Sequence, residues 1–167
     1  VSYDVTDYIS YSKENVLVVR VNASQYEGWF YEGAGIYRHV WLNRFANTHI
    51  ATDGVFAWSS VKGDVSSVTV ETTVENKGLA AGALSVVSYL TDRGGKKLVQ
   101  SKEYAISLPV NGRSVVKQSM TIAGARKWSL DDPYLYRVVS VVKQNGKVID
   151  SAKHRFGIRT IEIKPNG

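Results

Sequence analysis

The sequence predicts an all-β fold, and two patterns support this prediction. Apolar residues recur at every second position along most of the chain, which is the period of a strand that buries one face. No window of 11 or more residues has the i, i+3, i+4, i+7 spacing of an amphipathic helix. Apolar residues make up 44% of the 167 residues and charged residues 22%, so the chain can bury a core of ordinary size.

Residues 47–163 are expected to hold about seven strands. Their predicted spans are residues 48–58, 68–75, 84–90, 98–106, 116–122, 134–143 and 147–154. Turn residues separate them every 8 to 12 positions, which is typical of an immunoglobulin-like β-sandwich. The segment 98–106 is more polar than the strand predicted before it, so it is placed at a sheet edge. Asn145-Gly146 supplies the positive φ angles of a type I′ turn and predicts a hairpin between the last two strands.

The apolar faces of these strands predict which side chains form the core. The residues expected to share it are Val68, Val70, Val74, Val116, Met120, Tyr136 and Val138. Trp41, Trp58 and Trp128 are also predicted to be buried, because each has apolar neighbours on a strand or at a strand entry.

Residues 1–44 follow a different pattern. Two apolar strands are predicted there, at residues 15–21 and 36–42, with a loop rich in aromatic residues and glycine between them. Two strands cannot enclose a core alone, so this segment is interpreted as the tail of a domain whose beginning is missing. Residues 43–47 are the expected linker. The strands would leave apolar, unpaired edges, which predicts self-association through residues 1–44.

Charge and composition exclude several classes of function. The net charge of +6 divides into −3 over residues 1–83 and +9 over residues 84–167. No basic run exceeds two residues, so a solvated sheet face is favoured and no nucleic acid is expected as a partner. No apolar stretch reaches the roughly 18 residues of a membrane span. The chain has no cysteine, and therefore no disulfide or thiolate chemistry.

No cofactor and no metal are expected. His39, His49 and His154 lie on separate predicted strands without the spacing of metal ligands. Gly33-Ala34-Gly35 lacks the third glycine and the following helix of a phosphate-binding loop. Serine and histidine are plentiful, but no strand-turn-helix elbow that would expose a nucleophile is predicted.

Four stretches resemble glycoside hydrolase family two, the β-galactosidase, β-glucuronidase and β-mannosidase family. Residues 3–9 (YDVTDYI) with 15–21 (NVLVVRV) resemble the late part of its N-terminal sugar-binding jelly roll. Residues 29–42 (WFYEGAGIYRHVWL) resemble the closing signature of that domain. Residues 128–136 (WSLDDPYLY) resemble the late strand entry of its immunoglobulin-like second domain, and residues 156–161 (FGIRTI) the exit into its catalytic barrel.

The resemblance implies an excised middle piece of a multi-domain glycosidase. Residues 1–44 would be the remnant of a truncated galactose-binding-like jelly roll, 45–163 the immunoglobulin-like β-sandwich, and 164–167 the start of a linker to an absent barrel. The expected partners are the chain's own missing domains and the parent's carbohydrate substrate. Any signal peptide would lie upstream of Val1, and a periplasmic or extracellular parent is slightly favoured.

The resemblance carries over no catalytic residue. The family uses two glutamates on the barrel, the acid following an asparagine, and this chain has seven glutamates but no Asn-Glu pair. The chain itself is therefore expected to be inactive, while its parent would be a retaining β-glycosidase. Which glycoside that parent cleaves is left open between galactoside, glucuronide and mannoside.

The aromatic loop is the predicted contact site. Trp29 and Tyr31 near Arg38 could line a carbohydrate pocket or meet the rim of the barrel, because aromatic rings stack on the apolar faces of sugars. The alternative is that these rings close the jelly-roll core. Two other classes of function also stay open: a free-standing carbohydrate-binding module, which requires exposed coplanar aromatic rings, and an immunoglobulin-like interaction module, which requires an exposed apolar patch.

Overall fold

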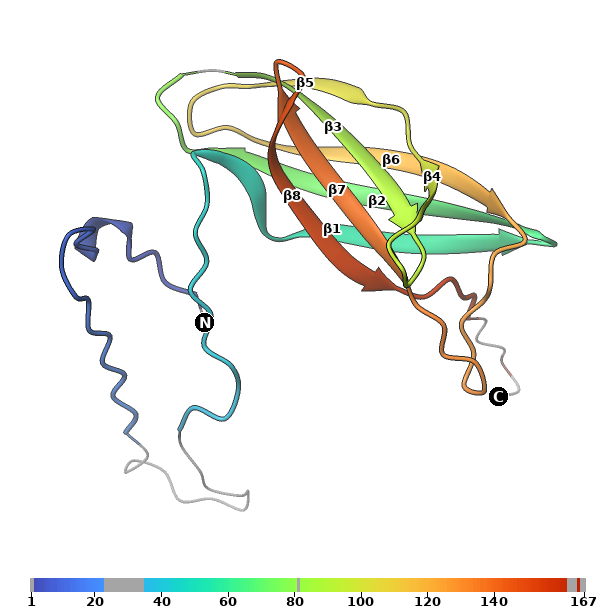
Figure 1. The fold of residues 1–167 in the computed structure, drawn as a ribbon, viewed down its shortest axis with the longest axis horizontal. Helices are drawn as coiled ribbons and strands as arrows, with labels where there is room; N and C mark the ends of the chain where they lie inside the picture. Colours follow the sequence, from blue (N-terminus) through green and yellow to red (C-terminus); the bar gives the residue numbers. More distant parts are fainter. Residues whose placement is uncertain (1, 23–34, 81, 162–164, 166–167) are drawn as a thin grey trace. The chain divides into compact units, whose positions relative to one another are not determined.

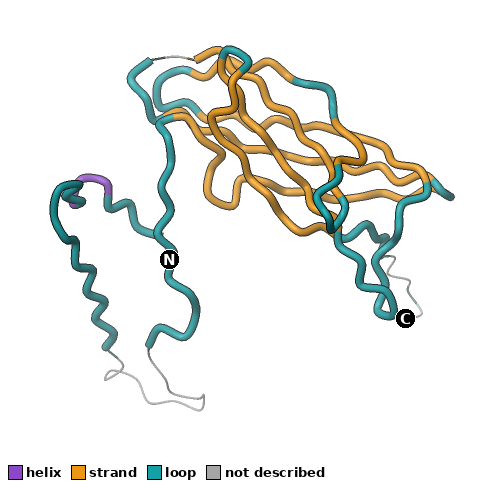
Figure 2. The backbone as a smooth tube through the Cα atoms, in the orientation of Figure 1, coloured by secondary structure: helices purple, strands orange, loops and turns teal. Residues whose placement is uncertain are grey.

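The computed structural model describes residues 2–22, 35–80, 82–161 and 165 of the chain (Figure 1). The chain divides into two units, residues 1–43 and residues 44–167, and all strands of the described residues lie in the second unit (Figure 2). The described residues form one 3-10 helix and no α-helix, which confirms the predicted all-β fold. None of them belongs to a helix long and apolar enough to cross a bilayer.

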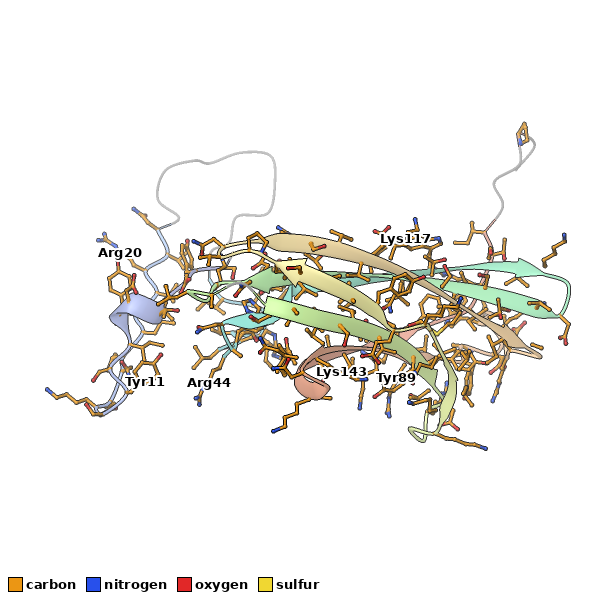
Figure 3. All side chains as sticks on the ribbon, turned by 90° about the horizontal axis from the view of Figure 1, so that it is seen from above. Tyr11, Arg20, Arg44, Tyr89, Lys117 and Lys143 are labelled. Atoms are coloured by element: carbon orange, nitrogen blue, oxygen red, sulfur yellow. The ribbon has the colours of Figure 1, made fainter. Side chains whose placement is uncertain are left out.

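The strands of the second unit form two sheets that pack as a sandwich. They are β1 (Thr48–Lys62), β2 (Val65–Asn76), β3 (Gly82–Thr91), β4 (Lys97–Gln100), β5 (Tyr104–Leu108), β6 (Arg113–Ala123), β7 (Tyr136–Gln144) and β8 (Lys147–Phe156). One sheet has the order β1-β2-β6, and the other has the order β4-β3-β7-β8 with β5 also paired to β3. Figure 3 shows the sandwich edge-on, with Lys117 on one outer side and Tyr89 and Lys143 on the other.

The turns use residues that tolerate a left-handed backbone. At the β7–β8 turn, Asn145 has a φ of 51° and Gly146 a φ of 76°, as the two-residue hairpin requires. The register pairs Gln144 with Lys147 across this turn, which confirms the predicted hairpin.

The polar segment 98–106 forms two strands where one was predicted. β4 ends at Gln100 and β5 begins at Tyr104, and both pair with β3. The chain leaves the ladder at Ser101, whose N–H still donates to the Ser88 carbonyl over 2.8 Å while the residue is buried. The predicted position of this segment at a sheet edge is confirmed.

Two apolar clusters fill the space between the sheets. The first contains Ile50, Val74, Leu84, Val86, Leu108, Val116 and Val142. The second contains Val68, Val70, Leu90, Met120, Tyr136, Val138 and Ile158. All seven side chains predicted for the core are buried, with Val74 and Val116 in the first cluster and the other five in the second.

A polar belt separates the two clusters. It consists of one inward-facing residue on each of four strands: Thr72 on β2, Ser88 on β3, Gln118 on β6 and Ser140 on β7. The residues two positions before and after each belt residue belong to the apolar clusters. The belt therefore interrupts the apolar alternation at the same level on both sheets.

Hydrogen bonds run through the belt in one direction. Thr72 Oγ1 donates to Ser140 Oγ over 2.8 Å, and Ser88 Oγ donates to Gln118 Oε1 over 2.8 Å. The Ser88 and Ser140 hydroxyls are 2.9 Å apart, and because the Ser88 proton is already committed, Ser140 donates to Ser88. Gln118 Nε2 completes the network by donating to the Val86 carbonyl at 3.0 Å and to Ser101 Oγ at 2.9 Å.

In the first unit, the strands predicted at residues 15–21 and 36–42 are wrong. The described parts of this unit, residues 2–22 and 35–43, contain no strand, because neither segment has a hydrogen-bonded neighbour there. A strand exists only through such a ladder. The apolar side chains of Val16 and Val18 are about four-fifths exposed, and Trp41, which was predicted to be buried, is 76% exposed.

Replacing Val70 by Asp should unfold the second unit. Val70 is fully buried in the second cluster, so the new carboxylate would lose its hydration without gaining a partner. The cost should be several kcal/mol, a large share of the roughly 5 to 15 kcal/mol that stabilises a domain. Urea unfolding followed by circular dichroism measures it. The control is Thr69→Asp, one residue away on the outer face of the same strand, and equal loss in both variants would contradict the assignment of faces.

Replacing Gln118 by Met tests the polar belt. Methionine has a similar volume but removes the donors to Val86 and Ser101 and the acceptor of Ser88. Buried groups left unpaired cost about 1 to 3 kcal/mol each, so we expect a loss of roughly 3 kcal/mol in the free energy of unfolding. Gln100→Met, at an exposed position on β4, is the matched control and should change stability by less than about 0.5 kcal/mol. A neutral Gln118→Met would show that the belt is dispensable.

Candidate functional site

The structure describes one of the three predicted contact residues. Trp29 and Tyr31 lie outside the described residues, so the predicted grouping with Arg38 remains a prediction. Arg38 lies in the segment 35–43, where the residues are exposed and its guanidinium is 5.4 Å from the centroid of the Tyr37 ring.

The described glutamates of the sandwich are each paired with a cation. Glu71 lies 3.4 Å from Lys117, and Glu75 lies 3.6 Å from Arg113. These two glutamates share the outer face of β2 but are four residues apart, or about 13 Å of strand. A retaining glycosidase needs its two carboxyl groups about 5 Å apart. The pair on β2 therefore does not have the geometry of that chemistry.

Glu103 lies between β4 and β5 on the other sheet. It accepts hydrogen bonds from Lys143 Nζ at 2.8 Å and from Ser85 Oγ at 2.5 Å. These two bonds favour the ionised carboxylate and lower the pKa of Glu103. A general acid needs the opposite change, because it must keep its proton near neutral pH.

The described histidines lie apart from one another. His49 is buried on β1, where Nδ1 is 2.8 Å from the Ala46 carbonyl and the ring stacks on Phe45 with centroids 4.5 Å apart. His39 contacts Trp41 edge to face, and His154 is exposed on β8. No three metal-ligating side chains come together in the described part of the chain.

An aromatic edge, formed by Phe56 and Trp58, lies on the outer face of the three-stranded sheet. Its rings have centroids 5.3 Å apart and are tilted by 34°. Phe56 is 63% exposed, and Lys117 Nζ lies 4.8 Å from the centroid of the Trp58 ring. The prediction that Trp58 is a core residue is wrong, because the inward positions of this strand are those of Val55, Ala57 and Val61.

A loop clasp closes the connection between β6 and β7. Arg126 binds Asp132 through two hydrogen bonds, from Nε at 2.6 Å and from Nη2 at 2.7 Å. Arg93 and Arg126 both lie against the Tyr134 ring, 4.8 and 4.6 Å from its centroid. The Tyr136 hydroxyl accepts the backbone N–H of Arg126 over 2.7 Å. The bidentate pair lowers the pKa of Asp132, so the clasp keeps its charge through the neutral range.

The two motifs 128–136 and 156–161, which are far apart in sequence, meet in space. The backbone N–H of Trp128 donates to the backbone carbonyl of Ile158 over 2.8 Å. Trp128 also lies so close to Gly157 that an added Cβ there would be 3.1 Å from the Trp128 Cβ, which explains the glycine. Arg159 covers the indole from 5.0 Å. Trp128 is thus half-buried between the loop and the chain that leaves β8, less enclosed than predicted.

Sequence reasoning did not find the aromatic edge or the loop clasp as sites. Residues 55–58 carry apolar side chains on both faces of the strand, so alternation could not decide which face is buried. The clasp depends on contacts between Arg93 and a loop forty residues later, which no local pattern reports.

Comparison with known proteins identifies what the chain is similar to. The family model of the glycosyl hydrolases family 2 matches residues 48–159. The chain is 33% identical to β-galactosidase BoGH2A of Bacteroides ovatus over 97% of its length, and 25% identical to a β-glucuronidase of Formosa agariphila over 96%. It spans about a fifth of the length of these relatives, 19% of each.

Solved structures agree with this result. A glycosyl hydrolase family 2 member from Bacteroides cellulosilyticus superposes with a TM-score of 0.66 and 28% identity, over 71% of this chain and 16% of that one. A β-glucuronidase of the same family has a TM-score of 0.66 at 23% identity, which supports the shared fold. The resemblance read from the sequence motifs is thereby confirmed.

Proposed function

The chain belongs to glycoside hydrolase family 2, and from this we propose that it is a non-catalytic β-sandwich portion of such an enzyme. In the parent, it would hold a sugar-binding domain, of which residues 1–44 would be a part, against a catalytic barrel that would follow the sandwich. The parent would hydrolyse a β-glycoside of the galactoside or glucuronide type, in keeping with the names of its relatives.

The observation that carries this proposal is that the described glutamates of the sandwich each form an ion pair with a lysine or arginine. Glu71, Glu75 and Glu103 are neutralised by Lys117, Arg113 and Lys143, each on a sheet face or edge. A glycosidase centre instead holds two carboxylates at a fixed separation around a sugar, with one pKa raised. Paired surface carboxylates support a structural role for the sandwich.

Two features support contact with other domains of the parent. The aromatic edge exposes the Phe56 ring on a sheet face, and aromatic residues are enriched in the buried centres of interfaces. The loop clasp and Trp128 fix the end of the sandwich at which β8 ends, so the chain would enter the next domain from a defined position.

The chain should show no glycosidase activity by itself. Purified chain is incubated with chromogenic β-galactoside, β-glucuronide and β-mannoside, with the Bacteroides ovatus β-galactosidase as the positive control. We expect release of chromophore at the rate of the buffer blank for all three substrates. Turnover that persists through a second purification and scales with the concentration of the chain would refute the non-catalytic role.

We also propose that the chain associates with a second copy of itself through residues 1–44. Val16, Val18, Ile36 and Val40 are between 58% and 82% exposed, and burying them against a second copy is favourable. Light scattering over a concentration series should show a mass that rises above 18.5 kDa. The variant Val16→Asp with Val18→Asp should shift this association to higher concentration. A monomeric mass at every concentration would contradict the proposal.

A further inference from the structure

The outer face of the five-stranded sheet carries a basic corner, formed by Lys97, Arg137, Lys153 and Arg155. The strand registers place Lys97 opposite Thr91, Thr91 opposite Arg137, and Arg137 opposite Arg155, so three cations share one row across β4, β3, β7 and β8. The next outward row contains Tyr89, Val139 and Lys153. Four positive charges therefore lie on two neighbouring rows.

Two of these cations are in an unfavourable arrangement. Arg137 and Arg155 are direct cross-strand partners on the same face, and like charges in that position destabilise a sheet. Neither guanidinium pairs with a carboxylate of the described residues. Lys153, one row further along β8, has no described counter-ion either. The repulsion is left uncompensated within the described chain.

Three described carboxylates of this sheet and its loops bind other groups, and Asp131, which is exposed in the loop before β7, forms no ion pair with the corner. Asp92, in the turn after β3, accepts the Lys96 N–H over 2.9 Å. The carboxylate of Asp132 accepts hydrogen bonds from Nε and Nη2 of Arg126. The carboxylate of Asp150 accepts the backbone N–H of Ile50 on β1 over 2.7 Å. None of these three hydrogen-bonded carboxylates is available to neutralise the corner without giving up its own bond.

The pairing of like charges sets the basic corner apart, because the charged residues that lie directly opposite each other on the other described strands have opposite signs. On the opposite sheet, Lys117 pairs with Glu71 and Arg113 pairs with Glu75. At the far end of the same sheet face, Lys143 pairs with Glu103. The opposed arginines of the basic corner have no such counter-charge among the described residues, and this arrangement points to an anion supplied from outside the sandwich.

The floor of the corner strengthens its attraction for an anion. Val139 and the neighbouring Val87 and Val141 form a buried apolar cluster on this outer face, with Tyr89 packed against it. An apolar floor lowers the local dielectric and reduces screening of the charges above it. Lys97 is also held in place, with its Nζ 4.6 Å from the centroid of the Tyr89 ring and donating to Gln100 over 2.7 Å.

We propose that the basic corner binds an acidic polysaccharide, a glycan that carries carboxylates along its chain. A row from β4 to β8 spans three strand spacings, or about 14 Å, and the next row is about 7 Å away. An extended polymer with repeated charges can reach all four cations at once, whereas a small anion would reach only Arg137 and Arg155. Tyr89 is partly buried beside these cations and adds an aromatic ring on which a sugar can pack. The choice of a glycan rests on the proposed function, a portion of a glycoside hydrolase family 2 enzyme.

Binding to polygalacturonate tests the proposal with the whole chain. Titration calorimetry at low ionic strength should show binding that weakens as sodium chloride is added, because the contacts are charge pairs on a surface. The double variant Arg137→Gln with Arg155→Gln should bind about tenfold more weakly or worse. The matched control, Arg113→Gln with Lys117→Gln, removes the same charge from the opposite sheet and should stay within about twofold of the unaltered chain.

Each other outcome overturns the proposal. Absence of binding, or equal loss in the two double variants, would show that no local site exists. Equal affinity for uncharged galactan would exclude recognition of carboxylates, and tighter binding of duplex DNA would identify a nucleic acid as the partner. Thermal unfolding provides a separate readout: removing the opposed arginines should leave the midpoint unchanged or raise it. A lower midpoint would mean that the arginines have partners within the chain.

Discussion

The polar belt between the two sheets is the constraint on which the rest of the sandwich depends. Apolar contacts are non-directional, and valines that alternate along every strand could pack in more than one alignment. The hydrogen bonds that run from Thr72 through Ser140 and Ser88 to Gln118 permit only one alignment of the strands, because each hydroxyl donor meets one acceptor. A slip of two residues along a strand would set these groups against valine, leaving several buried polar atoms unpaired at about 1 to 3 kcal/mol each.

The fixed alignment also determines what the outer faces present. Because inward and outward positions alternate, the place of Ser140 inside the sandwich puts Arg137 and Val139 outside on β7, and the register then sets Arg155 and Lys153 beside them. In the same way, Thr72 inside β2 puts Glu71 outside, next to Lys117. The basic corner and the paired charges of the opposite face are consequences of one internal register.

The alternation of apolar residues predicted the sandwich and its core, and its failures have physical causes. It identified Val70 and Tyr136 as buried, but a buried Gln118 gives no apolar signal and is recognised only by its partners. It predicted a strand at residues 15–21 from composition, although strands form only beside a hydrogen-bonded neighbour. The contact residues were predicted from the aromatic side chains of their loop and stay a prediction. The basic corner was hidden because its charges are distributed over three separate strands.

The exposed aromatic edge and the basic corner lie on opposite outer faces of a sandwich whose internal alignment is unique. A domain of this kind can act as a spacer, because its two faces keep a constant separation and orientation while neither is needed to hold the core together. The loop clasp extends this order to the end of the molecule, where Trp128 packs on Gly157 and fixes the path by which the chain leaves β8. In the proposed parent enzyme, order at that point would pass the alignment of the sandwich on to the catalytic domain. An enzyme assembled from separate domains needs such a rigid joint, since a shift of about 1 Å in a positioned group can lower a rate about a hundredfold.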